Sequence, residues 1–181
     1  DILWRHADGR LAQWWMDGTT GLGGGVFAQV DPAWSVAATA DFDGDGHADL
    51  LWRHTDGSVA LWRLSGTAVL DGTALSKVDA AWSIAGTGDF NGDGRADILW
   101  RNADGTVAQW WMDGATGIGG GAFAAPGAAW KIGAVTDFDG DGKSDILWRN
   151  DDGSLGIWEL DGLSIKAAVG LGNPGTEWSV L

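Results

Sequence analysis

Three nine-residue segments of the sequence place oxygen-bearing side chains at a spacing that suits a divalent cation. They read DFDGDGHAD at 41–49, DFNGDGRAD at 89–97 and DFDGDGKSD at 137–145. Each has Asp or Asn at positions 1, 3, 5 and 9, and Gly at positions 4 and 6. Calcium needs about six to eight oxygen ligands at about 2.3–2.6 Å, and glycine permits the tight coil that turns alternate side chains toward one point. We therefore expect each segment to be a calcium-binding loop.

The expected ligands are four side chains and, at position 7, a backbone carbonyl, because the residue type at position 7 changes from loop to loop. The ligand sets are Asp41, Asp43, Asp45, His47 and Asp49; Asp89, Asn91, Asp93, Arg95 and Asp97; and Asp137, Asp139, Asp141, Lys143 and Asp145. Three calcium ions are therefore expected as cofactors. Asn91 removes one negative charge from the second loop, so we expect this site to be the weakest.

Two other interpretations of these segments are less satisfactory. A solvated Asp-Gly turn would explain one copy but not three copies with the same internal spacing. An EF-hand loop shares the first positions but ends in a bidentate Glu at position 12. Position 12 is Trp52, Trp100 or Trp148 here, and no helical pattern flanks the loops. The EF-hand is therefore excluded, and the residues present do not suit a zinc site.

The composition limits the possible partners and the setting. The net charge is −14, and only two of the 25 acidic residues are Glu, so the chain is rich in the acid that favours turns and metal sites. Phosphate binding needs a basic face, so no nucleic acid partner is expected. No signal peptide or long apolar run is present, so no membrane insertion is expected. Because extracellular calcium would fill sites of modest affinity, we expect a secreted or cell-surface protein; the chain has no cysteine and hence no disulfide.

The chain is built from a repeated unit. The three loops begin 48 residues apart, and two series of tryptophans recur with the same spacing. These series are Trp4, Trp52, Trp100 and Trp148, and Trp34, Trp82, Trp130 and Trp178. The spacing divides a single domain, 1–181, into repeats 1–48, 49–96, 97–144 and 145–181. Repeats one and three share the segments QWWMDG and GGG.

Each repeat predicts four β-strands and no helix. A short apolar strand follows the loop, and an Asp-Gly turn connects it to a second strand that carries another tryptophan. A Gly-rich outer strand and a final strand that leads into the next loop complete the repeat. Four strands in a unit of 48 residues are typical of a propeller blade. The predicted fold is therefore all-β, a β-propeller of four-stranded antiparallel blades.

The loops, hairpins and tryptophans together resemble the FG-GAP/VCBS repeats of integrin α-subunit propellers and of many secreted bacterial proteins. The resemblance covers the whole chain. The loops read DFDGDG or DFNGDG rather than the integrin signature, so the bacterial VCBS type is the closer match. The resemblance implies a calcium loop between the innermost strand and the second strand of each blade, in an extracellular module. It does not imply ligand recognition of the integrin kind.

Tryptophan and arginine recur as packing residues would. Twelve of the 14 tryptophans occupy three repeat positions, and we expect them to pack within or between blades. Trp15 and Trp111 occur only in repeats one and three, each beside another tryptophan. Because neighbours on a strand point to opposite faces, these two are the candidate ligand contacts, in a lectin-like arrangement. The arginine that follows Trp4 and its equivalents is expected to form a structural ion pair or to bond a carbonyl between blades.

No catalytic constellation is found in the sequence. No Ser-His-Asp or Cys-His set can be assembled, and His6 and His54 exchange with Asn at the equivalent turns. A glycosidase needs two carboxylates about 5–10 Å apart across the scissile bond, and the clustered carboxylates are already assigned to metal. We therefore expect that the chain is not an enzyme.

The expected function is that of a calcium-stabilised, non-catalytic recognition or adhesion module that binds a glycan or a protein. The first alternative is a structural repeat protein that assembles head to tail into a larger ring or a surface filament. A polysaccharide-cleaving propeller is the third. The two ends of the chain are expected to build a composite blade, in which residues 177–181 pair beside residues 1–5. This pairing can occur within one chain or, as self-association through the terminal strands, between chains.

Overall fold

The computed structural model describes residues 1–180, which form β-strands in four antiparallel sheets and no helix. Sheet 1 contains β1 (Ile2–Arg5), β2 (Arg10–Asp17) and β3 (Thr20–Gln29). Sheet 2 contains β4 (Trp34–Ala40), β5 (Asp49–His54), β6 (Ser58–Ser65) and β7 (Ala68–Lys77). Sheet 3 contains β8 (Trp82–Gly88), β9 (Asp97–Asn102), β10 (Val107–Asp113) and β11 (Thr116–Ala124). Sheet 4 contains β12 (Trp130–Thr136), β13 (Asp145–Asn150), β14 (Leu155–Asp161) and β15 (Ser164–Gly172).

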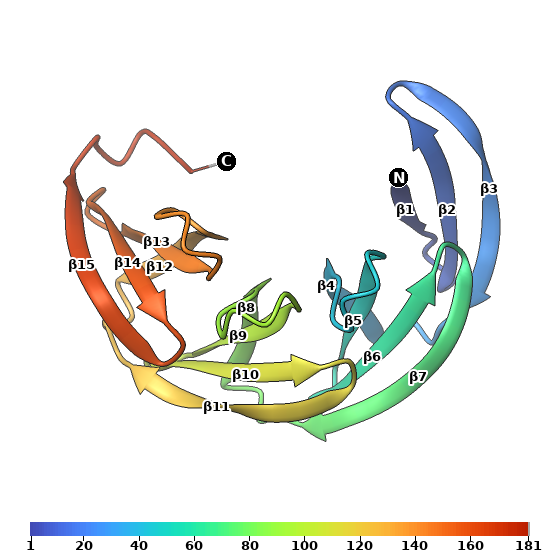
Figure 1. The fold of residues 1–181 in the computed structure, drawn as a ribbon, viewed down its shortest axis with the longest axis horizontal. Helices are drawn as coiled ribbons and strands as arrows, with labels where there is room; N and C mark the ends of the chain where they lie inside the picture. Colours follow the sequence, from blue (N-terminus) through green and yellow to red (C-terminus); the bar gives the residue numbers. More distant parts are fainter. Residues whose placement is uncertain (181) are drawn as a thin grey trace.

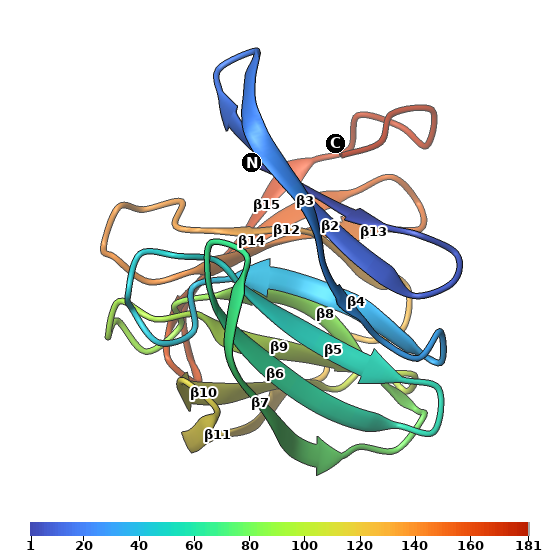
Figure 2. The same ribbon diagram turned by 90° about the vertical axis from the view of Figure 1, so that its right-hand side faces the viewer.

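The four sheets lie side by side along an arc (Figure 1). Strands β4, β8 and β12 line the inside of the arc, and β3, β7, β11 and β15 follow its outside. Figure 2 shows the same sheets from the side, where neighbouring sheets are seen to stack. The all-β prediction is confirmed, and the arc stays open between its two arms. Among residues 1–180 there is no helix that is long and apolar enough to cross a membrane.

Neighbouring sheets pack through two different faces. We call the side that carries Trp52, Trp100 or Trp148 the tryptophan face, and the opposite side, where the loop phenylalanine lies, the phenylalanine face. In one core cluster, Phe42 and Leu61 of sheet 2 contact Ile98 and Trp100 of sheet 3. Strand β9 sends alternate side chains to opposite faces, so Leu99 packs toward sheet 4 instead. The second strand is thus buried on both sides, which explains its continuous apolar run.

The outermost faces of the arc lack such a cover. Trp4 and Trp14 on the tryptophan face of sheet 1 are 45% and 50% exposed, whereas Trp148 is 2% exposed. At the other end Phe138 is 42% exposed, whereas its equivalents Phe42 and Phe90 are fully buried. Each end therefore presents one half of the interface that the interior sheets share.

The composite sheet expected from the chain ends is not formed within residues 1–180. Strand β1 pairs with β2, and residues 173–180 are not in a strand. The two ends lie on opposite arms of the opening (Figure 1), which explains why they do not meet. Leu181 lies outside the described residues, and pairing between chains stays a prediction.

An arginine in each of the first three sheets holds the segment that leads to the next sheet. Nη2 of Arg101 donates to the carbonyl oxygens of Gly127 at 2.7 Å and Trp130 at 2.8 Å. Its guanidinium carbon lies 5.2 Å from the ring centroid of Trp148, within cation–π range. Arg53 makes the same contacts one sheet earlier, with Val78, Trp82 and Trp100. Of the two expected roles, an ion pair or a bond to a carbonyl, the bond to a carbonyl is the one found.

The shared WW and GGG segments of repeats one and three have one structural cause. Trp111 of β10 stands directly opposite Gly119 of β11, and Trp15 stands opposite Gly23. A Cβ on Gly119 would lie 2.6 Å from Cε3 of Trp111, so the indole needs a residue without a side chain across the strand. In sheet 2 the same register position pairs Arg63 with Asp71, which form an ion pair instead.

We predict that Gly119→Ala destabilises the protein by about 1–3 kcal/mol, because the added methyl forces the Trp111 ring out of its place. Gly117→Ala in the same strand is the matched control, since a Cβ there meets nothing within 4 Å. Urea unfolding in the presence of calcium measures the stability of both variants. Equal midpoints for the two would contradict the packing role of Gly119.

Candidate metal centre

The first acidic loop, between β4 and β5, is folded around its first aspartate. Oδ1 of Asp41 accepts the backbone N–H of Gly44 at 2.7 Å, and Oδ2 accepts that of Gly46 at 2.8 Å. Gly44 and Gly46 have φ angles of 78° and 84°, a left-handed conformation that costs other residues energy. The other two loops repeat these bonds around Asp89 and Asp137. The glycines therefore form the coil that the sequence predicted.

The aspartate at position 9 ties the loop to the strand hairpin. Asp49 is fully buried, with Oδ2 accepting the N–H of Phe42 at 3.0 Å and Oδ1 accepting that of Leu64 at 2.9 Å. Burial raises the pKa of Asp49. In the second loop burial, followed by the negative charges of Asp93 and Asp89, raises the pKa of Asp97 to about 6. A cation among these carboxylates would lower both pKa values.

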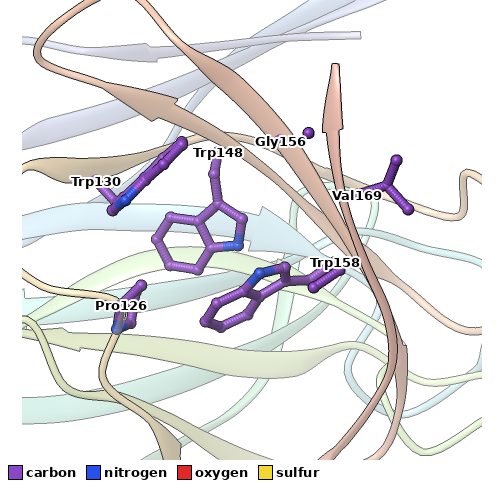
Figure 3. Close-up of a pocket in the computed structure, with 8 residues that line it drawn as sticks. Pro126, Trp130, Trp148, Gly156, Trp158 and Val169 are labelled. Atoms are coloured by element: carbon purple, nitrogen blue, oxygen red, sulfur yellow. The ribbon is translucent and has the colours of Figure 1, made fainter. Parts of the chain in front are cut away.

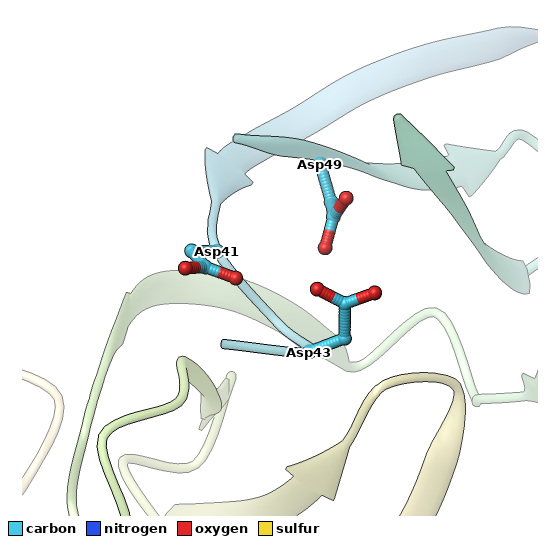
Figure 4. A group of neighbouring side chains, drawn as sticks. All are labelled: Asp41, Asp43 and Asp49. Atoms are coloured by element: carbon cyan, nitrogen blue, oxygen red, sulfur yellow. The ribbon is translucent and has the colours of Figure 1, made fainter. Parts of the chain in front are cut away.

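Carboxylate oxygens converge in the first and third loops. One oxygen from each of Asp41, Asp43 and Asp49 lies within 4.8 Å of the other two (Figure 4). The equivalent cluster comprises Asp137, Asp139 and Asp145. Oxygens that share a calcium ion at about 2.4 Å lie at most about 4.8 Å apart, so the residues present fit this ion. Both clusters can hold a metal ion.

The other expected ligands take different positions. Oδ1 of Asp45 accepts the N–H of His47 at 2.8 Å, and this aspartate lies outside the three-carboxylate cluster. Asp141 likewise accepts the N–H of Lys143. In the second loop, the amide oxygen of Asn91 accepts the N–H of Asp93 at 2.8 Å. The structure thus brings positions 1, 3 and 9 together in two loops, and a ligand role for position 5 stays a prediction.

Side chains at position 7 have a role that sequence reasoning missed. His47 is exposed, but Nε of Arg95 donates to the carbonyl oxygen of Asp43 at 3.2 Å. Lys143 forms an ion pair with Asp161 at the end of β14. Arg95 therefore reaches across to the preceding loop, and the variable position helps to hold the loops in place.

Backbone hydrogen bonds connect the first and second loops to the next sheet. The N–H of Ala96 in the second loop donates to the carbonyl oxygen of Asp41 at 2.8 Å. The N–H of Gly114, in the hairpin of sheet 3, donates to the carbonyl oxygen of Phe42 at 2.8 Å. Ser144 and Gly162 repeat both bonds one sheet later, to Asp89 and Phe90. The backbone of these two loops is thus part of the contact between sheets.

Basic side chains already contact some of the expected ligands. Nη1 of Arg63 lies 3.1 Å from Oδ2 of Asp43. Nζ of Lys166 lies 3.1 Å from Asp139 and 2.7 Å from Asp141, and these carboxylates raise the pKa of Lys166. A cation in the third loop must compete with the lysine ammonium group for Asp139. Sequence reasoning missed both residues because they lie on other strands.

The two candidate ligand tryptophans differ in their surroundings. Trp15 is 40% exposed. Trp111 is half-buried, packs against a core cluster, and donates from Nε1 to Oε1 of Gln109 at 2.8 Å. They lie on different sheets, β2 of sheet 1 and β10 of sheet 3, so the structure does not bring them into one site. Their role as ligand contacts stays a prediction.

Repeated antiparallel sheets, three of which have an Asp- and Gly-rich loop between their first two strands, define an all-β tandem-repeat protein. The model of the FG-GAP-like repeat matches residues 41–100 and 89–148, and each match begins at the first aspartate of a loop. The chain therefore belongs to the FG-GAP-like repeat family. No curated protein matches the chain.

Proposed function

We propose that the chain is a calcium-stabilised, non-catalytic recognition module built from propeller blades. In this proposal each sheet is one blade, built from the last strand of one 48-residue repeat and the first three strands of the next, and the protein works outside the cell. The carboxylate cluster of Asp41, Asp43 and Asp49 is the observation that carries the proposal, because this loop also bonds the next sheet. Metal binding at such a loop would stabilise the contact between blades.

The proposal assigns one calcium ion to each of the three loops. Positions 1, 3 and 9 supply the core of each site, and position 5 joins after its side chain turns from the backbone. The second site has the amide of Asn91 in place of a carboxylate and should bind most weakly. The ions neutralise carboxylates that otherwise repel one another, so their role is structural.

We predict that excess chelator lowers the melting temperature by more than about 10 °C. A ligand at 100 times its Kd adds about 2.7 kcal/mol per site, and each kcal/mol shifts a domain of this size by about 2–4 °C. Differential scanning calorimetry with calcium, with magnesium and with chelator measures this change. Calorimetric titration of Asp43→Asn, Asn91→Asp and Asp139→Asn assigns the sites. A melting temperature insensitive to chelator would contradict the proposal.

We propose a glycan or a protein as the ligand. Support comes from exposed aromatic residues such as Trp15 on a strongly acidic protein, and from the extracellular setting that the family resemblance implies. A glycan array probed with the calcium-loaded protein, and again with chelator present, tests the glycan. If no glycan on the array binds, the glycan is excluded as the ligand. Protein recognition then remains, because a glycan array does not test it.

A second candidate function is structural, and the two end faces favour it. The exposed tryptophan face of sheet 1 and the exposed phenylalanine face of sheet 4 are the two halves of one interface type. Copies joined through these faces would extend the arc into a larger ring or a filament.

A further inference from the structure

A pocket of about 360 Å³ lies on the tryptophan face of sheet 4 (Figure 3). Its lining includes Pro126, Trp130, Trp148, Gly156, Trp158 and Val169. Three indole rings from β12, β13 and β14 thus surround one space, and the segment before β12 bounds it on another side. This volume is within the range of about 300–1,000 Å³ for small-molecule sites.

The pocket contains a hydrogen-bond donor without a partner. Trp148 is 2% exposed, and its Nε1 is buried with no acceptor among residues 1–180. The ring of Trp158 lies 4.8 Å away between centroids at an interplanar angle of 60°. It offers the N–H only a π face, which is a weak acceptor. Figure 3 shows the Trp148 nitrogen on the side of its ring that faces Trp158. An acceptor atom of a ligand in this space would satisfy the donor.

The preceding sheet contains a smaller version of the same pocket. Its lining is Val78, Trp82, Trp100, Ala108 and Trp110, each 48 residues before its equivalent, and its volume is about 160 Å³. Nε1 of Trp100 also lacks a partner in the described structure. At these five positions two residues differ, since Pro126 replaces Val78 and Gly156 replaces Ala108, and the larger pocket also extends to Ala168, Val169 and Gly170 of β15. Gly156 lacks the methyl group that Ala108 contributes to the lining of the smaller pocket.

The chemistry of the lining selects among ligand classes. Aromatic and aliphatic walls suit a ring that presents a face of C–H groups, and the unpaired indole N–H requires an acceptor oxygen. Three tryptophans also resemble a cage for a quaternary ammonium group. However, the guanidinium of Arg101 lies 5.2 Å from the Trp148 ring and disfavours a second cation there. A cation would also leave the indole N–H unpaired. The pocket therefore suits a neutral ligand.

We propose that the pocket on sheet 4 binds a pyranose ring of a neutral glycan, with a ring or hydroxyl oxygen accepting the N–H of Trp148. The remaining hydroxyl groups face water at the open side of the pocket. This proposal rests on the glycan-recognition form of the proposed function and gives it a location. The smaller pocket of sheet 3 does not admit the ring.

The test compares the wild type with Gly156→Ala and Ala108→Gly. A Cβ at Gly156 would lie 3.3 Å from the carbonyl oxygen of Val169, and alanine at the equivalent positions 12, 60 and 108 shows that the sheets tolerate it. The probes are methyl glycosides of glucose, galactose, mannose, fucose and N-acetylglucosamine, titrated into the calcium-loaded proteins by calorimetry and ¹H–¹⁵N NMR. We expect Gly156→Ala to weaken binding at least tenfold and Ala108→Gly to add a second site. The indole N–H resonance of Trp148 is assigned as the one that is absent from the spectrum of Trp148→Phe. In the wild type this resonance should shift when a glycoside binds.

Unchanged melting temperature and calcium binding show that each variant is folded. If a glycoside binds the wild type and Gly156→Ala equally well, without moving the Trp148 resonance, the pocket proposal is wrong while glycan recognition stands. If neither the glycosides nor the glycan array shows binding, the pocket proposal and the glycan-recognition form of the proposed function both fail. Choline chloride is the competing probe, and binding of choline in place of the glycosides would overturn the choice of a neutral ligand.

Discussion

Asp97→Ala should lower the free energy of unfolding more than substitutions at the other loop positions do, even when calcium is absent. The carboxylate of Asp97 is fully buried and accepts the N–H of Phe90 at 2.9 Å and that of Met112 at 2.8 Å. Alanine leaves both donors buried without a partner. Hydrogen bonds to a charged group contribute about 1.5–3 kcal/mol each, so we expect a loss of about 3–5 kcal/mol in the free energy of unfolding.

Asp93→Ala in the same loop is the matched control. Asp93 accepts the N–H of Arg95 and lies nearer the surface, so in chelator its loss should be below about 1 kcal/mol. In calcium both variants also lose affinity for the ion. Denaturant unfolding with and without chelator separates the two effects. If Asp97→Ala lost stability only in calcium, Asp97 would be a metal ligand with no separate structural role.

The coiled conformation of the acidic loops could be predicted because it depends on residues that are close together in the sequence. Alternating oxygens and two glycines within nine residues determine where Asp41, Gly44 and Gly46 lie, and the structure has them as expected. The second role of position 9 could not be predicted. Asp49 accepts the N–H of Leu64, 15 residues further along the chain, and this pairing depends on the register of β5 and β6.

Contacts between sheets were harder to predict than the sheets themselves. The 48-residue spacing marks equivalent residues but not which face of a strand they occupy or what covers that face. Pairing within a sheet has a similar difficulty, because the position of Gly119 opposite Trp111 depends on an irregularity in the register between β10 and β11. The pocket on sheet 4 was missed for the same reason. Its tryptophans recur in other repeats as packing residues, and Pro126 and Gly156 distinguish it from the equivalent lining of sheet 3.

The largest expected change in oligomeric mass comes from association of copies through the two end faces. We expect the 18.9 kDa chain to assemble head to tail in calcium, with the interior contact between sheets 3 and 4 as its template. There Gly162 donates its N–H to Phe90 and Arg101 covers Trp148. Between copies, Gly18 would donate to the exposed Phe138, and Arg149 would cover Trp4. Burial of large apolar side chains on both faces supplies the driving force.

Two variants with one damaged face each test this head-to-tail geometry. Trp14→Glu blocks the tryptophan face and Phe138→Glu blocks the phenylalanine face, so either protein alone should sediment as a monomer. A mixture of the two should form a heterodimer, because each partner keeps the face that the other has lost. Ile118→Glu is the control, since Ile118 is exposed on the outer strand β11 and should leave the assembly intact. A wild type that stays monomeric at high concentration in calcium would contradict the assembly. A mixture that stays monomeric would contradict the head-to-tail geometry. Self-association of one variant alone would also contradict it, because an interface between two identical faces would be lost in one variant and kept in the other.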